Sequence, residues 1–244
     1  MFSHLQANQF LTELTHFCET FKDLSHVKIS SKMDSSPLTD IDRGVSDFFK
    51  QHSLAQGLNF YSEEDHHQHQ FPALILDPLD GTRDFIEGRP ECTVSAAWMM
   101  APSFDSQSFS LLYNPFTGFH LHSFDRPAWT PREQNSPWLG LVSRSEWNKG
   151  LFKAHTNGEL TLEPKGSIAF KLGLMCTGGC DFVVSLRPKN VWDIAAGTLQ
   201  AHQRGFEFWS AGKRVSEFSA AQYGAPLIWA RPHQVATLLS EFSP

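Results

Sequence analysis

The apolar positions of the first 55 residues follow helical spacing. Between residues 11 and 24, apolar side chains recur every three or four positions with charged residues between them, which predicts an amphipathic helix. A polar stretch from Ser30 to Pro37 interrupts the pattern. A second helix is predicted from about Thr39 to His52, with Val45, Phe48 and Phe49 facing inward.

After Gly57 the pattern changes to short strands. The apolar run at residues 73–76 ends in Asp77 and Pro78, which indicates a buried strand that stops at a loop. Further strands are predicted at residues 92–100, 108–113 and 119–124, the last two forming a hairpin. Beyond residue 137, strands alternate with helices predicted at 146–155, 168–176, 192–203 and 233–242. This alternation favours a layered α/β fold.

The segment from Asp125 to Pro137 carries three prolines and little apolar periodicity. Such a segment is typical of a boundary between structural units. We therefore expect two halves, residues 1–130 and residues 131–244.

Composition and charge narrow the class of protein. With 41% apolar and 19% charged residues in 244 positions, the chain can bury a sizeable core, which excludes a disordered or fibrous protein. The net charge of −6 repels polyphosphate backbones and disfavours binding to a nucleic-acid polymer. A small phosphorylated substrate stays possible, because a bound divalent cation can reverse the local sign of a site.

The cysteines and the longest apolar run indicate in which cellular compartment the protein is expected. Cys18, Cys92, Cys176 and Cys180 fit no common zinc spacing and are expected to be buried free thiols, as suits a reducing compartment. The longest unbroken apolar run has six residues, too short to span a bilayer, and no basic residue precedes Lys22 as a secretory leader would require. We expect a soluble, cytoplasmic protein without a transmembrane segment.

The segment from Asp77 to Thr82 is the most informative in the chain. Two carboxylates, Asp77 and Asp80, follow a buried strand three residues apart, with Pro78 and Gly81 shaping the turn. An oxygen-only donor set of this kind suits a hard cation such as Mg²⁺, which shares it with waters and substrate phosphate. The alternative is an ordinary turn in which Asp77 is a cap.

Two other acidic positions strengthen the functional interpretation. Glu63, Glu64 and Asp65 precede the strand that ends at Asp77, although such a triplet is often only a solvated loop. Asp193 lies in the first turn of a predicted helix, where the helix dipole alone would favour an acid. Together these weak signals predict one shared metal site.

The order and spacing of several segments resemble the inositol monophosphatase superfamily, and within it the bacterial 3′(2′),5′-bisphosphate nucleotidases. The segments are Lys32–Asp42, Ser62–Asp65, Asp77–Phe85, Ser143–Ser145, Gly166–Ser167 and Trp192–Gly197. The resemblance implies an α-β-α-β-α sandwich of the inositol monophosphatase and fructose-1,6-bisphosphatase type. It also implies that residues 1–130 carry most metal ligands, and that residues 131–244 carry Asp193 and much of the substrate pocket.

The resemblance assigns roles by position. Two or three Mg²⁺ ions are expected, with Asp77 bridging two of them. Asp42, Thr82 and Glu63 match the residues that orient and activate the attacking water. The expected metal ligands are Glu63, Asp77, the Leu79 carbonyl, Asp80 and Asp193. The expected substrate contacts are Gly81, Thr82, Ser143, Arg144, Ser167, Lys171 and Asp193.

The implied reaction is hydrolysis of 3′-phosphoadenosine 5′-phosphate to AMP and phosphate, in sulfur metabolism. Arg144, Lys171 and Arg187 are candidates to bind the second phosphate, although Arg144 is equally suited to a structural ion pair. Inositol monophosphate, fructose 1,6-bisphosphate or another small phosphate ester stays open as substrate, as does a non-catalytic regulator. The expected partner is a small phosphorylated molecule, and the expected assembly is a monomer or homodimer. The His-rich loop at residues 66–69 is interpreted as solvated or as a flap over the metals.

Overall fold

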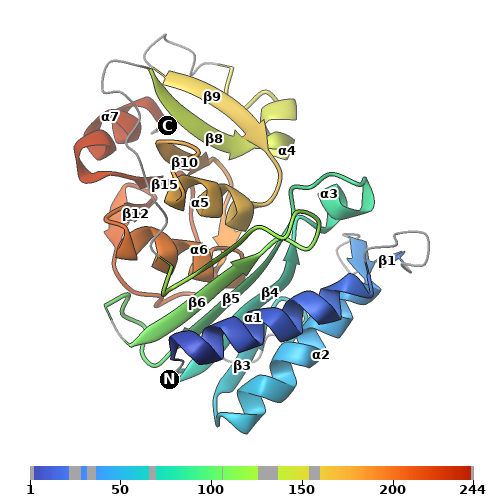
Figure 1. The fold of residues 1–244 in the computed structure, drawn as a ribbon. Helices are drawn as coiled ribbons and strands as arrows, with labels where there is room; N and C mark the ends of the chain where they lie inside the picture. The colour runs from blue at the N-terminus through green and yellow to red at the C-terminus, as the bar shows by residue number, and fades with distance from the viewer. Residues whose placement is uncertain are drawn as a thin grey trace.

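The computed structural model describes residues 3–21, 29–31, 37–65, 70–105, 107–125, 137–153 and 160–242. In these residues two β-sheets and three groups of helices stack in the order α-β-α-β-α (Figure 1). Three separate clusters of buried apolar side chains fill the spaces between the layers.

The first outer layer is a pair of helices, α1 (His4–Glu19) and α2 (Asp40–Ala55), that lie across one face of the first sheet (Figure 1). Both begin with a capping box, Ser3 with Gln6 and Thr39 with Asp42, which satisfies amides that the first turn leaves free. Between them in the chain, β1 (Ile29–Ser31) pairs with β2 (Pro37–Thr39).

The first sheet has the strand order β3-β4-β5-β6-β7 and is antiparallel except for the parallel pair β3 and β4. Its strands are β3 (Asn59–Ser62), β4 (Ala73–Asp80), β5 (Thr93–Met99), β6 (Ser108–Tyr113) and β7 (His120–His122). Because side chains alternate between the two faces of a strand, Leu74 and Leu76 pack against the outer helices while Ile75 faces the central layer. Asp77 continues the series of Ile75, so it starts from the central face.

The central layer consists of α5 (Ile168–Cys176) and α6 (Val191–Gln203), which lie between the two sheets (Figure 1). A Cβ on Gly197 would come within 2.6 Å of Leu172 Cδ1, so this glycine permits the close approach of the two helices.

The second sheet has the order β13-β12-β15-β10-β8-β9, and α7 (Pro232–Phe242) covers its outer face. Its strands are β8 (Trp138–Ser143), β9 (Leu160–Lys165), β10 (Phe182–Ser185), β12 (Glu207–Ser210), β13 (Lys213–Val215) and β15 (Leu227–Ala230). The remaining short elements are α3 (Thr82–Ile86), α4 (Arg144–Asn148), β11 (Lys189–Asn190) and β14 (Gln222–Tyr223).

The layered fold class predicted from the sequence is confirmed, with local differences. The strand predicted to stop at Asp77 continues to Asp80, with a register irregularity between these residues. The helix predicted at 146–155 ends at Asn148, because Gly150 adopts a left-handed conformation, with φ of 75°. All four cysteines are buried and in the thiol form, as expected. The division into halves at residue 130 stays a prediction.

Among the described residues, no helix is both long enough and apolar enough to cross a membrane.

Candidate active site

The acids of the Asp77–Thr82 segment are held by the irregular end of β4. The Leu79 amide donates to Asp77 Oδ1 at 3.0 Å, which closes a tight turn within the last residues of this strand. Gly81 then adopts a φ of 91°, and a Cβ there would lie 2.7 Å from the carbonyl oxygen of Glu91. Only glycine fits this position without strain, so the turn that aims Asp77, Asp80 and Thr82 depends on it.

Thr82 and Asp42 meet although 40 residues separate them in the chain. Thr82 Oγ1 lies 3.2 Å from Asp42 Oδ1 and 2.9 Å from the Leu79 carbonyl oxygen, so its single proton can be donated to either. Asp42 is fully buried, and its Oδ2 accepts from the amide and the hydroxyl of Thr39. The structure therefore holds a hydroxyl and an oriented carboxylate side by side, at the two positions that the family resemblance pairs.

Asp80 is bound by the beginning of α5, from the other half of the chain. Asp80 Oδ2 accepts from Ser167 Oγ at 2.6 Å and from the Ala169 amide at 2.7 Å. Ser167 itself has a φ of 42°, a conformation that residues other than glycine rarely adopt. This strained cap joins the first sheet to the central helices at the site.

Asp193 enters from α6. Its Oδ2 accepts from the Asn190 amide at 3.0 Å in a capping box, which fixes the acid in the first turn of the helix. Asp193 is close enough to Asp80 and Glu63 for their negative charges to act on it. The predicted ligands from β4, from the segment after β3 and from α6 thus lie in one electrostatic neighbourhood.

The pKa values of two acids report this crowding. Burial raises the pKa of Asp77 well above its ordinary 3.8, and the charges of Glu63, Asp80, Asp193 and Asp42 raise it further. Burial, followed by the charge of Asp80, raises the pKa of Asp193 to about 7, against the opposing effect of Lys189. Burial and neighbouring negative charge both oppose the ionisation of Asp77 and Asp193, and a bound cation would relieve this opposition.

The donor set fits a hard divalent cation that keeps part of its water shell. All predicted donors are oxygens, which suits Mg²⁺. In the described part of the chain, no three Asp, Glu, His or Cys side chains already form a group that could hold an ion. Mg²⁺ is commonly held by one or two carboxylates together with waters and substrate phosphates, so a closed protein cage is not required. The five assigned ligands stay a prediction.

We predict that these acids make the metal-free protein less stable as pH rises. Raised pKa values mean that the folded chain holds protons that the unfolded chain has released between about pH 4 and pH 7, so the free energy of unfolding falls across this window. In a chelating buffer, the Tm of the parent relative to the Asp193→Asn variant should fall on the order of 5 °C from pH 5 to pH 8. A difference that is constant or rises with pH would contradict this electrostatic picture.

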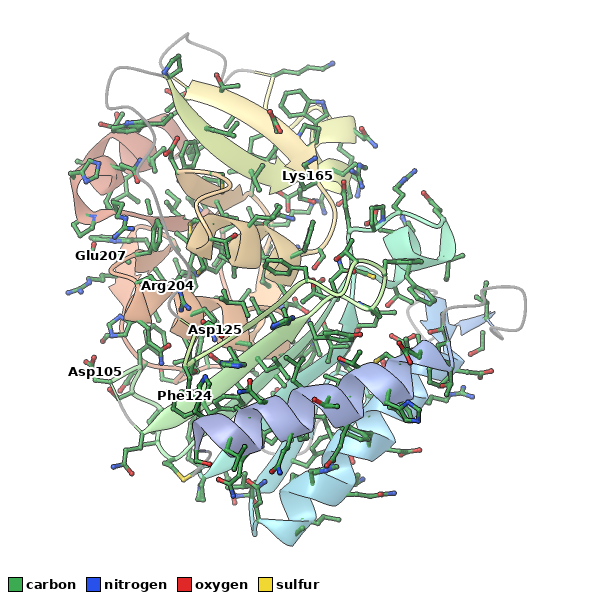
Figure 2. All side chains as sticks on the ribbon, viewed as in Figure 1. Asp105, Phe124, Asp125, Lys165, Arg204 and Glu207 are labelled. Atoms are coloured by element: carbon green, nitrogen blue, oxygen red, sulfur yellow. The ribbon has the colours of Figure 1, made fainter. Side chains whose placement is uncertain are left out.

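Arg144 is bound by acids in this structure. Its guanidinium donates to Asp84 at 2.6 Å and lies 2.5 Å from Glu91. Lys165, which is labelled in Figure 2 at the end of β9, lies 4.0 Å from the same Glu91. The sequence left open whether Arg144 binds phosphate or forms a structural ion pair, and the contacts are those of the ion pair. Ser143 caps α4 and lies 3.0 Å from Ser145 Oγ.

Lys171 is also engaged within the protein. It is 2% exposed, and its ammonium group donates to the carbonyl oxygens of Lys165, Gly166 and Ser167. Burial lowers its pKa to about 8, opposed by the charge of Asp80. Lys171 therefore stabilises the turn that carries Ser167. Direct contact between Lys171 and a phosphate stays a prediction.

A buried carboxylate beside the site was not predicted from the sequence. Glu146 is fully buried, accepts from Ser185 Oγ and the Leu186 amide at 2.7 Å each, and lies 4.0 Å from Lys189 Nζ. Glu146 belongs to no recognisable sequence motif, because the residues that donate hydrogen bonds to it come from a different strand. Residues 66–69, interpreted as a solvated loop or as a flap over the metals, lie outside the described residues. Arg187, a candidate for the second phosphate, is exposed.

The sequence matches the model of a known protein family over most of its length. The model of the inositol monophosphatase family matches residues 5–211. The chain belongs to this family. A 3′(2′),5′-bisphosphate nucleotidase CysQ of Buchnera aphidicola is 22% identical over 227 residues, covering 82% of this chain and 84% of the relative. A fructose-1,6-bisphosphatase of Pyrococcus furiosus is 29% identical over 195 residues, covering 73% and 71%.

Solved structures of this family share the fold. An IMPase of Thermotoga maritima superposes with a TM-score of 0.75 at 18% identity, covering 96% of this chain and 95% of that one. An IMPase/NADP phosphatase complexed with Mg²⁺ and phosphate gives a TM-score of 0.73 at 15% identity, covering 96% and 93%. At these identities the likeness shows the fold alone, whereas family membership indicates a phosphatase of the IMPase and CysQ kind.

Proposed function

We propose that this protein is a Mg²⁺-dependent phosphomonoesterase that removes the 3′-phosphate of 3′-phosphoadenosine 5′-phosphate, giving AMP and phosphate. The observation that carries the proposal is the Thr82–Asp42 contact at 3.2 Å beside the crowded acid Asp77. A hydroxyl placed on a fixed carboxylate next to an oxygen-only donor set suits in-line attack of water on phosphorus.

The residues proposed to hold the ions are Glu63, Asp77, the Leu79 carbonyl, Asp80 and Asp193. When bound there, divalent cations would acidify the attacking water and draw negative charge from the phosphoryl oxygens and the leaving alkoxide. The protein's own contribution is position, since Asp77 and Asp80 are each fixed by main-chain amides.

Thr82 and Asp42 would handle the proton of the water. In this proposal Thr82 Oγ1 accepts a hydrogen bond from the water and donates its own proton toward Asp42 Oδ1. Asp42 can hold this orientation because both donors of Thr39 bind its other oxygen. The Gly81 and Thr82 amides, at the start of α3, are proposed to contact phosphate oxygens.

The relatives support the nucleotidase branch. Those from Buchnera aphidicola and Shigella flexneri, 22% and 27% identical, are both named 3′(2′),5′-bisphosphate nucleotidase CysQ. The competing candidate is hydrolysis of inositol monophosphate or fructose 1,6-bisphosphate, which the names of the structural neighbours and of the Pyrococcus furiosus relative favour.

Phosphate release from the purified chain tests the proposal. The substrates are 3′-phosphoadenosine 5′-phosphate, inositol 1-phosphate and fructose 1,6-bisphosphate, each with Mg²⁺ and with a chelator. We expect Mg²⁺-dependent release with the highest kcat/KM on the bisphosphorylated nucleotide. Higher kcat/KM on either other ester would overturn the substrate assignment. Absence of release from all three esters would favour a non-catalytic regulator.

A further inference from the structure

On β5, two buried hydroxyl groups lack a hydrogen-bond partner in the described part of the chain. Thr93 is fully buried and Ser95 is 1% exposed, and neither Thr93 Oγ1 nor Ser95 Oγ has a partner among the described residues. A buried polar group without a partner destabilises the folded state, so native proteins rarely keep one without a purpose. Two on one strand, two residues apart, call for an explanation.

The register of the sheet places both hydroxyls beside the acids of the site. Ser95 lies directly opposite Asp77, and Thr93 lies directly opposite Asp80, across the antiparallel pair of β4 and β5. Directly opposed residues point to the same face, with their Cβ atoms about 4.5–5.5 Å apart. At that separation, a serine or threonine hydroxyl reaches a neighbouring carboxylate by choosing another of its staggered rotamers.

A hydroxyl on the next strand shows that this face of the sheet does supply partners. Ser110, on β6, is fully buried, and its Oγ accepts from Gln200 Nε2 at 2.9 Å and lies 3.2 Å from Ser123 Oγ. Asp77 and Asp80 take their own hydrogen bonds from Leu79, Ser167 and Ala169 instead. Among the described residues, the buried side-chain hydroxyls without a partner are therefore those at the two positions that face the acids.

We infer that Ser95 and Thr93 are positioning residues for the carboxylates of Asp77 and Asp80. Their hydroxyls donate to these carboxylates when a divalent cation draws the acids together, and they orient the ligand oxygens from the neighbouring strand. The inference rests on the proposed function, since it presumes that Asp77 and Asp80 hold the metal. Donors behind metal ligands commonly change metal affinity 10- to 100-fold when they are removed.

The test is Mg²⁺ affinity and thermal stability of the full chain, stripped of metal with a chelator and then titrated calorimetrically with MgCl₂. The Ser95→Ala and Thr93→Val variants should each raise the Kd for Mg²⁺ about 10-fold. Their metal-free Tm should match or exceed that of the parent, because an unpartnered hydroxyl has been removed. Thr93→Ser, which keeps the hydroxyl, should retain the parent Kd within about twofold.

Ser110→Ala is the matched control, because it removes a partnered hydroxyl from the same face. It should lower the metal-free Tm and leave the Kd for Mg²⁺ unchanged. Parent-like Kd values in both Ser95→Ala and Thr93→Val would overturn the inference while leaving the metal site intact. Should Ser95→Ala fail to fold, Thr93→Val decides, since valine keeps the volume of threonine. A parent chain that binds no Mg²⁺ would overturn the proposed function as well.

Discussion

Replacing Asp77 with asparagine is expected to lower the rate of phosphate release at least about 10³-fold. Asparagine keeps the oxygen that accepts from the Leu79 amide but removes the charge that would bind cations. The metal-free Tm should stay near that of the parent or rise, because burial and four neighbouring acids oppose the ionised form of Asp77. Turnover with Mg²⁺ and thermal unfolding in chelator measure the two effects.

Asp105→Asn provides the matched control for this substitution. Asp105 is an exposed acid that contacts His202 at 2.8 Å, and the same chemical change there should leave turnover unchanged. An Asp77→Asn protein that turned over within tenfold of the parent rate would exclude Asp77 as a metal ligand.

Removing the Thr82 hydroxyl is expected to have the second largest effect. Thr82→Val keeps the shape of the side chain but leaves Asp42 Oδ1 without the proton donor that lies 3.2 Å away. We expect kcat to fall about 10²- to 10³-fold, the range typical of a lost proton-transfer group, with KM changed less than about threefold. Steady-state kinetics on the substrate with the highest kcat/KM measures the changes in kcat and in KM separately.

Thr82→Ser separates chemistry from packing in this experiment. Serine restores the hydroxyl without the methyl group, so most of the kcat should return. If valine and serine at position 82 gave the same kcat, the hydroxyl would have no part in the reaction.

The helices and strands with a strong period were predictable from sequence. Residues 168–176 form a helix with the predicted bounds, because an apolar run is bracketed by Gly166 and by the turn at Gly178. The helix at Thr82–Ile86 was missed because five residues are too few to show a period. The three-residue strands β1 and β2 were missed for the same reason, in a stretch interpreted as a polar interruption.

The residues of the site also differ in whether the sequence could predict them. The acids at Asp77 and Asp80 could be found because they follow a buried strand, and the positions of Asp42 and Thr82 were implied by family resemblance. The partners of Arg144 could not be found, because Asp84 lies 60 residues away and meets it only where α4 approaches α3. The same limit applies to Lys171, whose acceptors are main-chain carbonyls that carry no signal in the sequence.

The hydrogen bonds from Ser167 and Ala169 to Asp80 make the spacing of the acids depend on how the layers are stacked. Asp80 belongs to one sheet, its donors open a helix of the central layer, and Asp193 arrives on the neighbouring helix. A slip between layers too small to disturb either sheet would already change the distances among these oxygens. We therefore expect inactivation by heat or denaturant to precede global unfolding.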